Sequence, residues 1–236
     1  MLSFFCACTE ESSEKETAKR NRIYSSDSSY CDTTFNRSGG IEMIKYFNKN
    51  SELIKSIEFW QNSNPFKLEK YKNGVKDDSD VLYYSNGNID YLLFHVNSLT
   101  DGDYFHYRED GRIWEYLFFW SDTIIYSQTY DTMLNVIEQE GEAPYRFIWN
   151  GDNPRKINDS CFFIIYGASP PNTEIIYTIK NKSKTVANTA NPAFPMIYSF
   201  RPKNKGNETF ECTIKFKDKK SGKIKTYKYS MTFKVY

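Results

Sequence analysis

Histidine is scarce in this chain, with only His95 and His106 among 236 residues, which argues against most histidine-based metal sites and catalytic triads. The sequence also lacks a C-x-x-C pair, a G-x-S-x-G nucleophile elbow, a phosphate-binding loop and a dinucleotide fingerprint. No run approaches the length of about 18 apolar residues that a membrane-spanning helix needs. These absences predict a protein that is not an enzyme and that has neither a cofactor nor a metal site.

Aromatic residues are abundant by contrast, with 18 Phe, 19 Tyr and 4 Trp, or 17% of the chain. Glycine and proline are modest, at 11 and 8 residues. Flat and β-branched side chains suit the pleated, half-buried surface of a sheet better than a helix. The composition therefore predicts an all-β fold class.

The net charge of +1 hides an asymmetry between the two halves of the chain. Residues 1–150 hold 15 Lys and Arg against 24 Asp and Glu, a net charge of −9, and residues 151–236 hold 16 against 6, a net charge of +10. Such a difference indicates two units, of which the second attracts anionic partners. The alternative is that lysines on exposed strand faces keep a β-domain soluble and protect its edges.

A short pattern repeats in the first half at a distance of 24 residues. Residues 83–89 read YYSNGNI and residues 107–113 read YREDGRI, with looser copies at 47–53 and 71–75. Asn-Gly and Asp-Gly between aromatic runs are strong hairpin signals, because Gly accepts a positive φ. The repeat predicts a sheet of successive antiparallel hairpins over residues 41–140.

The stretch YKNGVKDDSDVLYYSNGNIDYLLF, residues 71–94, resembles the second variant of the MORN (membrane occupation and recognition nexus) repeat. The resemblance covers roughly residues 44–130. The usual D-G-x-W between repeats is replaced by Asp101-Gly-Asp-Tyr104. MORN-variant proteins include antitoxin-like repeat proteins and many bacterial lipoproteins. The resemblance implies a folded MORN-like sheet with a binding surface, and it implies no catalysis.

The pattern changes after the polar break at residues 140–144. Strands are expected at 145–149, 161–166, 174–180, 196–200, 210–217 and 225–235. Short strands with alternating apolar and polar residues predict an antiparallel β-sandwich over residues 145–236. Cys161 and Cys212 lie close to an immunoglobulin-like spacing between strands B and F, so the domain resembles immunoglobulin-like modules in architecture. The two cysteines are candidates for a disulfide in an oxidising compartment, or for buried free thiols.

The first eight residues resemble the end of a bacterial lipoprotein signal, in which Cys8 receives the lipid. Only seven residues precede Cys8 and none is basic, whereas complete signals carry a basic segment and a longer apolar stretch. We therefore expect either a true start upstream of Met1 or an apolar terminus without consequence. Residues 9–40 are rich in Ser, Thr, Glu and Lys, so a disordered tether is expected there. The resemblance places the protein in the cell envelope, on the outer membrane or cell surface, held to the membrane by a lipid anchor.

The C-terminal hairpin carries a candidate anion-binding patch, made of Lys215, Lys217, Lys219, Lys223 and Lys225. Its expected partners are a glycan, lipid headgroups or a protein, and nucleic acid is not expected because no outward aromatics accompany the lysines. The acidic runs at residues 77–80 and 101–103 lack the twelve-residue calcium loop and its terminal Glu, so they are interpreted as solvated turns.

The sequence thus predicts a membrane-anchored cell-envelope lipoprotein with a non-catalytic role in binding or assembly. A soluble, repeat-type, antitoxin-like protein that binds a partner protein is the first alternative. A glycan-binding or glycan-active surface protein is the second.

Overall fold

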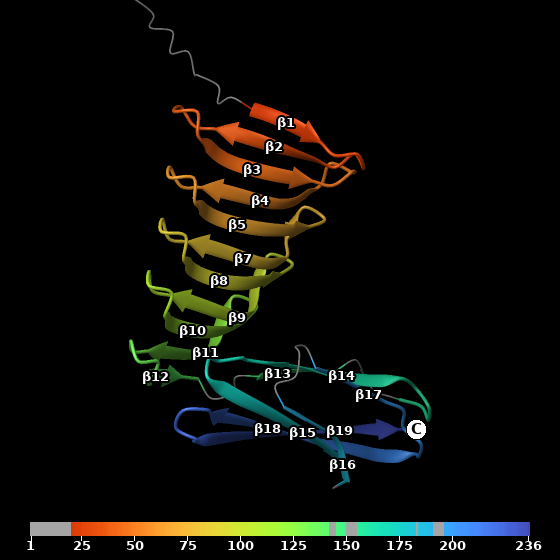
Figure 1. The fold of residues 1–236 in the computed structure, drawn as a ribbon. Coiled ribbons are helices and arrows are strands. Elements are labelled where there is room, and N and C mark those ends of the chain that lie inside the picture. Colours follow the sequence, from red (N-terminus) through yellow and green to blue (C-terminus); the bar gives the residue numbers. More distant parts are fainter. Residues whose placement is uncertain (1–19, 142–144, 150–154, 183, 191–195) are drawn as a thin grey trace, which may run out of the picture.

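The computed structural model describes residues 20–141, 145–149, 155–182, 184–190 and 196–236. Strands joined by turns make up the described elements, so the expectation of an all-β fold is confirmed. The described strands form three sheets, of twelve, three and four strands. In Figure 1 the large sheet is a stack of hairpins, and the two small sheets lie at its C-terminal end.

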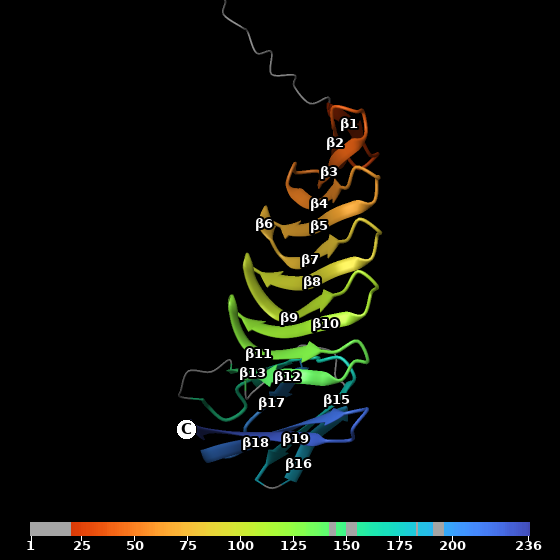
Figure 2. The ribbon, with the colours of Figure 1, turned by 90° about the vertical axis from the view of Figure 1, so that its left-hand side faces the viewer.

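The large sheet, called the repeat sheet below, is an antiparallel meander. Apart from the short β6, which pairs only with β5, each strand pairs with the next strand along the chain. Figure 2 shows that its strands are bent, and register shifts at β-bulges accompany the bending. The strands are β1 Arg20–Tyr24, β2 Tyr30–Phe35, β3 Ile41–Phe47, β4 Leu53–Phe59, β5 Pro65–Lys72, β6 Val75–Lys76, β7 Asp78–Tyr83, β8 Ile89–Val96, β9 Leu99–Tyr107, β10 Ile113–Trp120, β11 Thr123–Tyr130 and β12 Val136–Glu140.

Turns along one edge of the repeat sheet share one backbone geometry. In each of these periodic turns, the N–H of the first residue donates to the carbonyl of the fifth, and the fourth residue has a positive φ. Gly87 and Gly111 hold that fourth position in the two turns that the sequence predicts, and both turns are confirmed. The periodic turns are 36–40, 60–64, 84–88, 108–112 and 131–135.

From the turn at 60–64 onward, side chains connect each periodic turn to the next one. Asn86 and Asn88 both donate through Nδ2 to the carbonyl of Glu109, at 2.9 and 2.7 Å. One repeat earlier, Asn62 and Asn64 donate to the carbonyl of Ser85, at 2.7 and 2.8 Å. The turns therefore carry the hydrogen bonds that stack one hairpin on its neighbour, in addition to the strand ladders.

The repeat sheet begins earlier than the sequence predicts. β1 and β2 lie within residues 20–40, which were expected to belong to a disordered tether, so that expectation is wrong for this part of the segment. Polar side chains are tolerated there because Arg22 forms an ion pair with Asp32 on the neighbouring strand, at 2.6 Å. Residues 9–19 of the expected tether lie outside the described residues.

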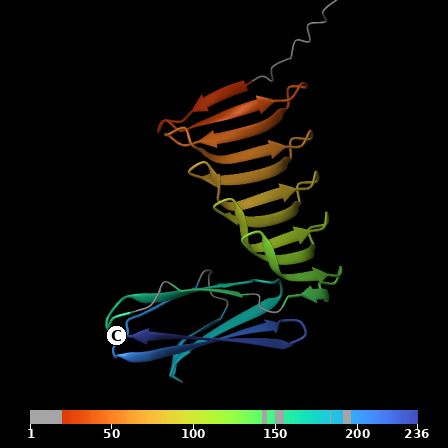
Figure 3. The same ribbon diagram turned by 180° about the vertical axis from the view of Figure 1, so that it is seen from behind.

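The looser copies of the repeat belong to the other edge of the sheet. The turn at 48–52 joins β3 to β4, and Asn73 and Gly74 join β5 to β6. Figure 3 shows this opposite edge from behind. The earlier turns that lie on the same edge as the turn at 84–88 are therefore 36–40 and 60–64. The repeat pattern in the sequence does not reveal them, because neither contains Asn-Gly.

The repeat sheet is a single layer over most of its length. One row of directly opposed residues crosses it from β3 to β12, and this row is called the cross-sheet row: Ile44, Ile57, Leu68, Val81, Leu92, Phe105, Tyr116, Gln128 and Gln139. Its aliphatic members are half-buried, whereas Tyr116 is completely buried. Among the described residues, the buried core of this sheet is confined to β10 and β11, where Ala168 of the following domain packs against it.

The following domain is a β-sandwich whose two sheets share one core. One sheet has the order β13-β14-β17 and the other β16-β15-β18-β19. Residues from β14, β15, β18 and β19 pack in a single cluster, so the expected antiparallel β-sandwich is confirmed. The strands are β13 Tyr145–Trp149, β14 Cys161–Gly167, β15 Thr173–Asn181, β16 Lys184–Ala190, β17 Met196–Phe200, β18 Gly206–Asp218 and β19 Ile224–Val235.

All six strands that the sequence predicts in this domain are present, and β16 is the one that it misses. β16 reads KTVANTA and is an edge strand paired only with β15, so it needs no continuous apolar face. Among the described residues, no helix has the length and apolarity needed to cross a bilayer.

Candidate functional site

The sandwich meets the repeat sheet through a buried polar contact. The backbone N–H of Ser169 donates to Asp103 Oδ1 at 3.0 Å and to the hydroxyl oxygen of Tyr116 at 2.8 Å, and the Tyr116 hydroxyl donates to the same Asp103 oxygen. Burial raises the pKa of Asp103 and raises that of Tyr116 well above its ordinary value. This contact fixes the segment after β14 against β9 and β10.

A second contact lies at the tip of the β18–β19 hairpin. Lys220 Nζ donates to the backbone carbonyl of Met133 at 2.9 Å and to Asn135 Oδ1 at 2.6 Å. Met133 and Asn135 belong to the last periodic turn of the repeat sheet. The hairpin of one domain is thus tied to the turn of the other.

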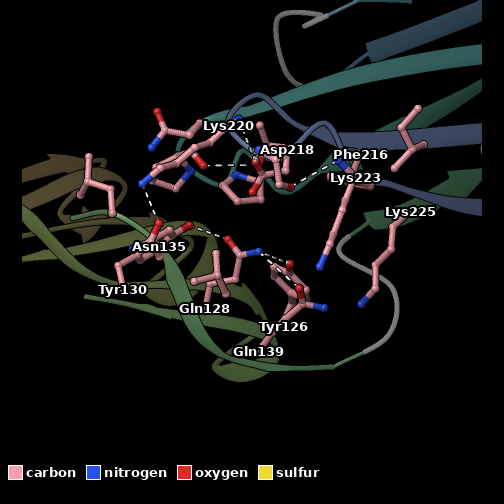
Figure 4. Close-up of a pocket in the computed structure, with 18 residues that line it drawn as sticks. Tyr126, Gln128, Tyr130, Asn135, Gln139, Phe216, Asp218, Lys220, Lys223 and Lys225 are labelled. Atoms are coloured by element: carbon pink, nitrogen blue, oxygen red, sulfur yellow. Dashed lines mark hydrogen bonds between the residues drawn. The ribbon is translucent and has the colours of Figure 1, made fainter. Parts of the chain in front are cut away.

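Between these two contacts lies a cleft of about 800 Å³, called the junction cleft. This volume is within the range of pockets that hold small ligands. Figure 4 shows residues of both domains around it. From the repeat sheet it is lined by Tyr126, Gln128, Tyr130, Leu134, Asn135, Val136 and Gln139, and from the sandwich by Pro170, Pro171, Asn172, Thr173, Phe216, Asp218, Lys220, Ser221, Lys223, Ile224 and Lys225.

The repeat-sheet wall of the cleft is where the cross-sheet row changes from apolar residues to glutamines. Gln128 is held by both neighbouring phenols, since its Nε2 donates to the Tyr126 hydroxyl at 2.7 Å and its Oε1 accepts from Tyr130. Gln139 lies opposite Gln128 on β12 and stays exposed. Burial raises the pKa of Tyr126 and that of Tyr130, so both phenols remain protonated. The wall therefore presents neutral hydrogen-bonding groups.

The structure divides the lysine patch predicted from the sequence between two faces of the hairpin. Lys223 and Lys225 line the cleft, and Lys225 lies opposite the buried Phe216. Lys215 and Lys217 alternate with the inward residues of β18, so they lie on the outer face, where Lys217 pairs with Glu174 at 3.1 Å. The backbone N–H of Lys219 donates to the carbonyl of Asn172, and its side chain is not among the cleft-lining groups.

Lys220 joins Lys223 and Lys225 as the third lysine of the cleft. Among the described residues of the lining, Asp218 is the only acid, and its carboxylate accepts the backbone N–H groups of Ser221 and Lys220 at 2.6 and 2.8 Å. These hydrogen bonds hold the pKa of Asp218 below its usual range. The cleft is therefore cationic.

A second cluster of charged residues lies on the repeat sheet, away from the cleft. Asp80 Oδ2 accepts from Lys76 Nζ at 2.6 Å and lies 3.1 Å from His95 Nε2. Asp80 Oδ1 and His95 Nδ1 are buried and have no hydrogen-bond partner among the described residues. No group of three or more His, Cys, Asp and Glu within the described part of the chain is placed to hold a metal ion.

The other residues singled out in the sequence have distinct positions. Cys161 on β14 and Cys212 on β18 are both buried free thiols, so the structure contains no disulfide between them, and burial raises the pKa of Cys212 to about 12. Cys8, the candidate lipidation site, lies outside the described residues.

Sequence reasoning missed the repeat-sheet wall of the cleft and the Asp103–Tyr116–Ser169 contact. The signal that points to the wall is the pair Gln128 and Gln139, which ends an apolar row of the sheet. This signal can be recognised only once the strand register is known.

No family model and no curated protein matches the chain. Among solved structures, it is similar to the extracellular domain of a one-component system, BT4673, from B. thetaiotaomicron, with 8% identity and a TM-score of 0.25. The match covers 92% of this chain and 36% of that chain. The chain thus spans about a third of that protein's length, and a TM-score of this size carries no argument about fold or function.

Proposed function

We propose that the chain is a non-catalytic binding protein of the bacterial cell envelope, anchored through a lipid on Cys8, which holds its ligand in the junction cleft. The observation that carries this proposal is the cleft itself, because neither the repeat sheet nor the sandwich forms it alone. The Ser169 contact and the Lys220 contact brace the two walls. A braced cleft between two domains is a common position for a ligand site.

The chemistry of the lining favours binding over catalysis. General acid–base catalysis needs a group whose pKa lies near the working pH. The phenols of Tyr126 and Tyr130 are shifted away from neutrality, and the carboxylate of Asp218 is shifted below its usual range. The remaining polar groups of the lining are amides, lysines and the hydroxyls of Thr173 and Ser221, which can hold a ligand in place.

Occupation of the cleft is tested on the protein released from its own membranes. Native mass spectrometry is expected to show a bound mass that Gln139→Trp removes, because the indole would fill the cleft. Glu138→Trp is the matched control, since Glu138 lies on the opposite face of the same strand. A bound mass that both variants keep, or a ligand that the protein converts to product, would contradict the proposal.

The anchor is tested separately by membrane fractionation. The wild-type protein is expected in the membrane fraction and Cys8→Ala in the soluble fraction. Full-length protein found only in the cytosol, and unchanged by Cys8→Ala, would contradict the lipoprotein assignment.

A second candidate is a soluble, antitoxin-like protein that binds a partner protein through the repeat sheet. The observation that favours it is the cross-sheet row, whose aliphatic residues on β3 to β8 are only half-buried in a single-layer sheet. Cytosolic recovery in the fractionation experiment would favour this candidate over the lipoprotein.

A further inference from the structure

Two lysines of the junction cleft, Lys223 and Lys225, lie close together in the sequence at the start of β19. Lys223 closes the β18–β19 turn opposite Asp218, and Lys225 follows two residues later. Residues two positions apart in extended chain are separated by about 7 Å along the backbone. Figure 4 shows both side chains extending in the same direction. The pair suits a ligand with two separated anionic groups better than one compact anion.

The acids near the cleft do not neutralise these lysines. Asp218 is held by its own turn, and Lys223 and Lys225 have no ion-pair partner among the described residues. Glu138 and Glu140 of β12 alternate with Gln139, so their side chains lie on the face of the sheet opposite the cleft. Lys217 on the outer face of the same hairpin is paired with Glu174. Lys223 and Lys225 thus bring positive charge to the cleft that no acid of its lining neutralises.

Each wall of the cleft supplies an amide group that can recognise hydroxyls. Gln139 is exposed, and Asn172 lies between the two prolines and β15 on the sandwich side. Side-chain amides carry both a donor and an acceptor, as does a sugar hydroxyl. The buried phenols Tyr126 and Tyr130 fix Gln128 and leave no ring face open for a nucleobase to stack on.

We infer that the junction cleft takes an acidic saccharide, whose carboxylate or sulfate groups pair with Lys223 and Lys225 and whose hydroxyls bond the amides of Gln139 and Asn172. This inference rests on the proposed function and names its ligand class. Lysine suits such a ligand, because its flexible ammonium pairs with an anion without the fixed bidentate geometry of Arg.

The experiment uses the full chain carrying Cys8→Ala, and isothermal titration calorimetry with defined probes. The acidic probes are a chondroitin sulfate hexasaccharide and an oligogalacturonate of the same length, and chitohexaose is the neutral probe. Both acidic probes are expected to bind, more weakly as the salt concentration rises, and chitohexaose is expected to bind at least about tenfold more weakly.

Two double variants with the same change in net charge locate the site. Lys223→Gln with Lys225→Gln is expected to weaken binding of the acidic probes about tenfold or more, because charge-assisted contacts are lost. Lys215→Gln with Lys228→Gln, on the outer face of the same hairpin, is expected to leave the affinity within about twofold. Far-ultraviolet circular dichroism of both variants checks that the sandwich remains folded.

The inference is overturned if neither acidic probe binds, if chitohexaose binds as tightly as the acidic probes, or if the outer-face variant loses as much affinity as the cleft variant. The proposed function fails on different results, namely cytosolic localisation, conversion of a ligand, or a bound mass that Gln139→Trp does not remove.

Discussion

Glu69 on β5 lies at the centre of the charged cluster of the repeat sheet. Its Oε1 accepts from Lys67 Nζ at 2.8 Å and from Lys76 Nζ at 2.6 Å, and its Oε2 accepts from the Tyr71 hydroxyl at 2.8 Å. Burial raises the pKa of this carboxyl, but the three hydrogen bonds outweigh burial and lower it to about 2. A single-layer sheet can hold this residue 93% buried because long neighbouring side chains cover it.

Glu69→Gln is expected to lower the free energy of unfolding by about 1–3 kcal/mol at pH 7, because two ammonium groups lose their charged acceptor. In the wild type, the stabilisation by Glu69 is present above pH 4.5 and is lost as the pH falls toward 2, because the pKa is lowered on folding. Urea unfolding between pH 2 and pH 7 measures both effects. Glu109→Gln is the matched control, since Glu109 is exposed and uses only its backbone carbonyl in the turn contacts. Equal stability of both variants would contradict the structural role of the cluster.

Gly141 is the residue at which the chain leaves the repeat sheet. It has φ +83°, and a Cβ atom there would lie 2.3 Å from the carbonyl oxygen of Ile125. Gly87 has φ +89°, but a Cβ atom there would have only an ordinary contact, at 3.8 Å. Gly87→Ala is therefore expected to lower the free energy of unfolding by about 1–2 kcal/mol, because alanine is strained at a positive φ. Gly141→Ala is expected to lower it further, because the backbone around Ile125 must also move. Thermal unfolding compares the two, and an equal loss would contradict the close approach at Gly141.

At the scale of elements, the periodic turns explain why the hairpins stack in register. Asn86 makes two hydrogen bonds of different kinds. Its Oδ1 accepts from the N–H of Asn88 within the turn, and its Nδ2 donates to the backbone carbonyl of Glu109 in the next turn. Asn86→Asp keeps the first hydrogen bond and loses the second, whereas Asn86→Ala loses both. We expect unfolding free energies lower by about 0.5–1 kcal/mol for Asp and about 1–2 kcal/mol for Ala. Urea unfolding checks this order, and equal losses would show that the hydrogen bond within the turn adds nothing to the contact with the next turn.

The sequence predicts these elements unevenly, for physical reasons. Turns with Asn-Gly or Asp-Gly are recognisable, because a positive φ favours Gly. The equivalent positions are Ser63 in one turn and Leu134 in another, where stacking on the neighbouring hairpins holds residues that rarely adopt this φ. The start of the sheet at Arg20 is hidden for a related reason, since β1 and β2 are stabilised by pairing and an ion pair more than by an apolar pattern.

Ser63→Gly places glycine at the fourth position of a periodic turn that lacks it, so this substitution is expected to stabilise the protein. Ser63 has φ +68°, so glycine is expected to raise the unfolding free energy by about 0.5 kcal/mol, with relief of backbone strain exceeding the entropy cost. Ser85→Gly is the control within the neighbouring turn, because Ser85 does not have a positive φ. A loss of stability in Ser63→Gly would contradict the strain at that position.

For the whole molecule, the candidate site depends on segments that are distant in the chain. Lys220 and Asn135 are 85 residues apart, and Ser169 and Asp103 are 66 apart, yet each pair is in hydrogen-bond contact. The sequence predicts the two domains and the lysine-rich hairpin. It cannot predict which lysines face the repeat sheet, because that depends on the register of β18 and β19 and on how the domains dock.

Asp103 makes the domain junction sensitive to pH. Its pKa is raised by burial, so folding favours the protonated carboxyl. The contribution of this group to stability is therefore full below the ordinary pKa of 3.8 and declines as the pH rises through the raised value. Asp103→Asn is expected to remove this decline, because its amide oxygen still accepts from Ser169 and Tyr116 and carries no charge. Thermal unfolding from pH 3 to pH 8 measures the slope, and an unchanged slope in Asp103→Asn would assign it to another group.

We expect Lys220 to hold the junction cleft in shape, because it joins the hairpin tip to the last periodic turn. Lys220→Ala is expected to release the hairpin tip, because a charge-assisted contact of about 1 kcal/mol is lost. Amide hydrogen exchange at residues 131–135 and 218–223 is then expected to become about threefold to tenfold faster. Exchange at Asn86–Gly87, far along the sheet, is expected to stay unchanged. Lys219→Ala is the matched control, because Lys219 contacts Asn172 through its backbone N–H, which alanine retains. If Lys219→Ala loosened the turn as much as Lys220→Ala, the two domains would be held at this end by the general charge of the hairpin, and the cleft would lack the fixed wall that selective binding requires.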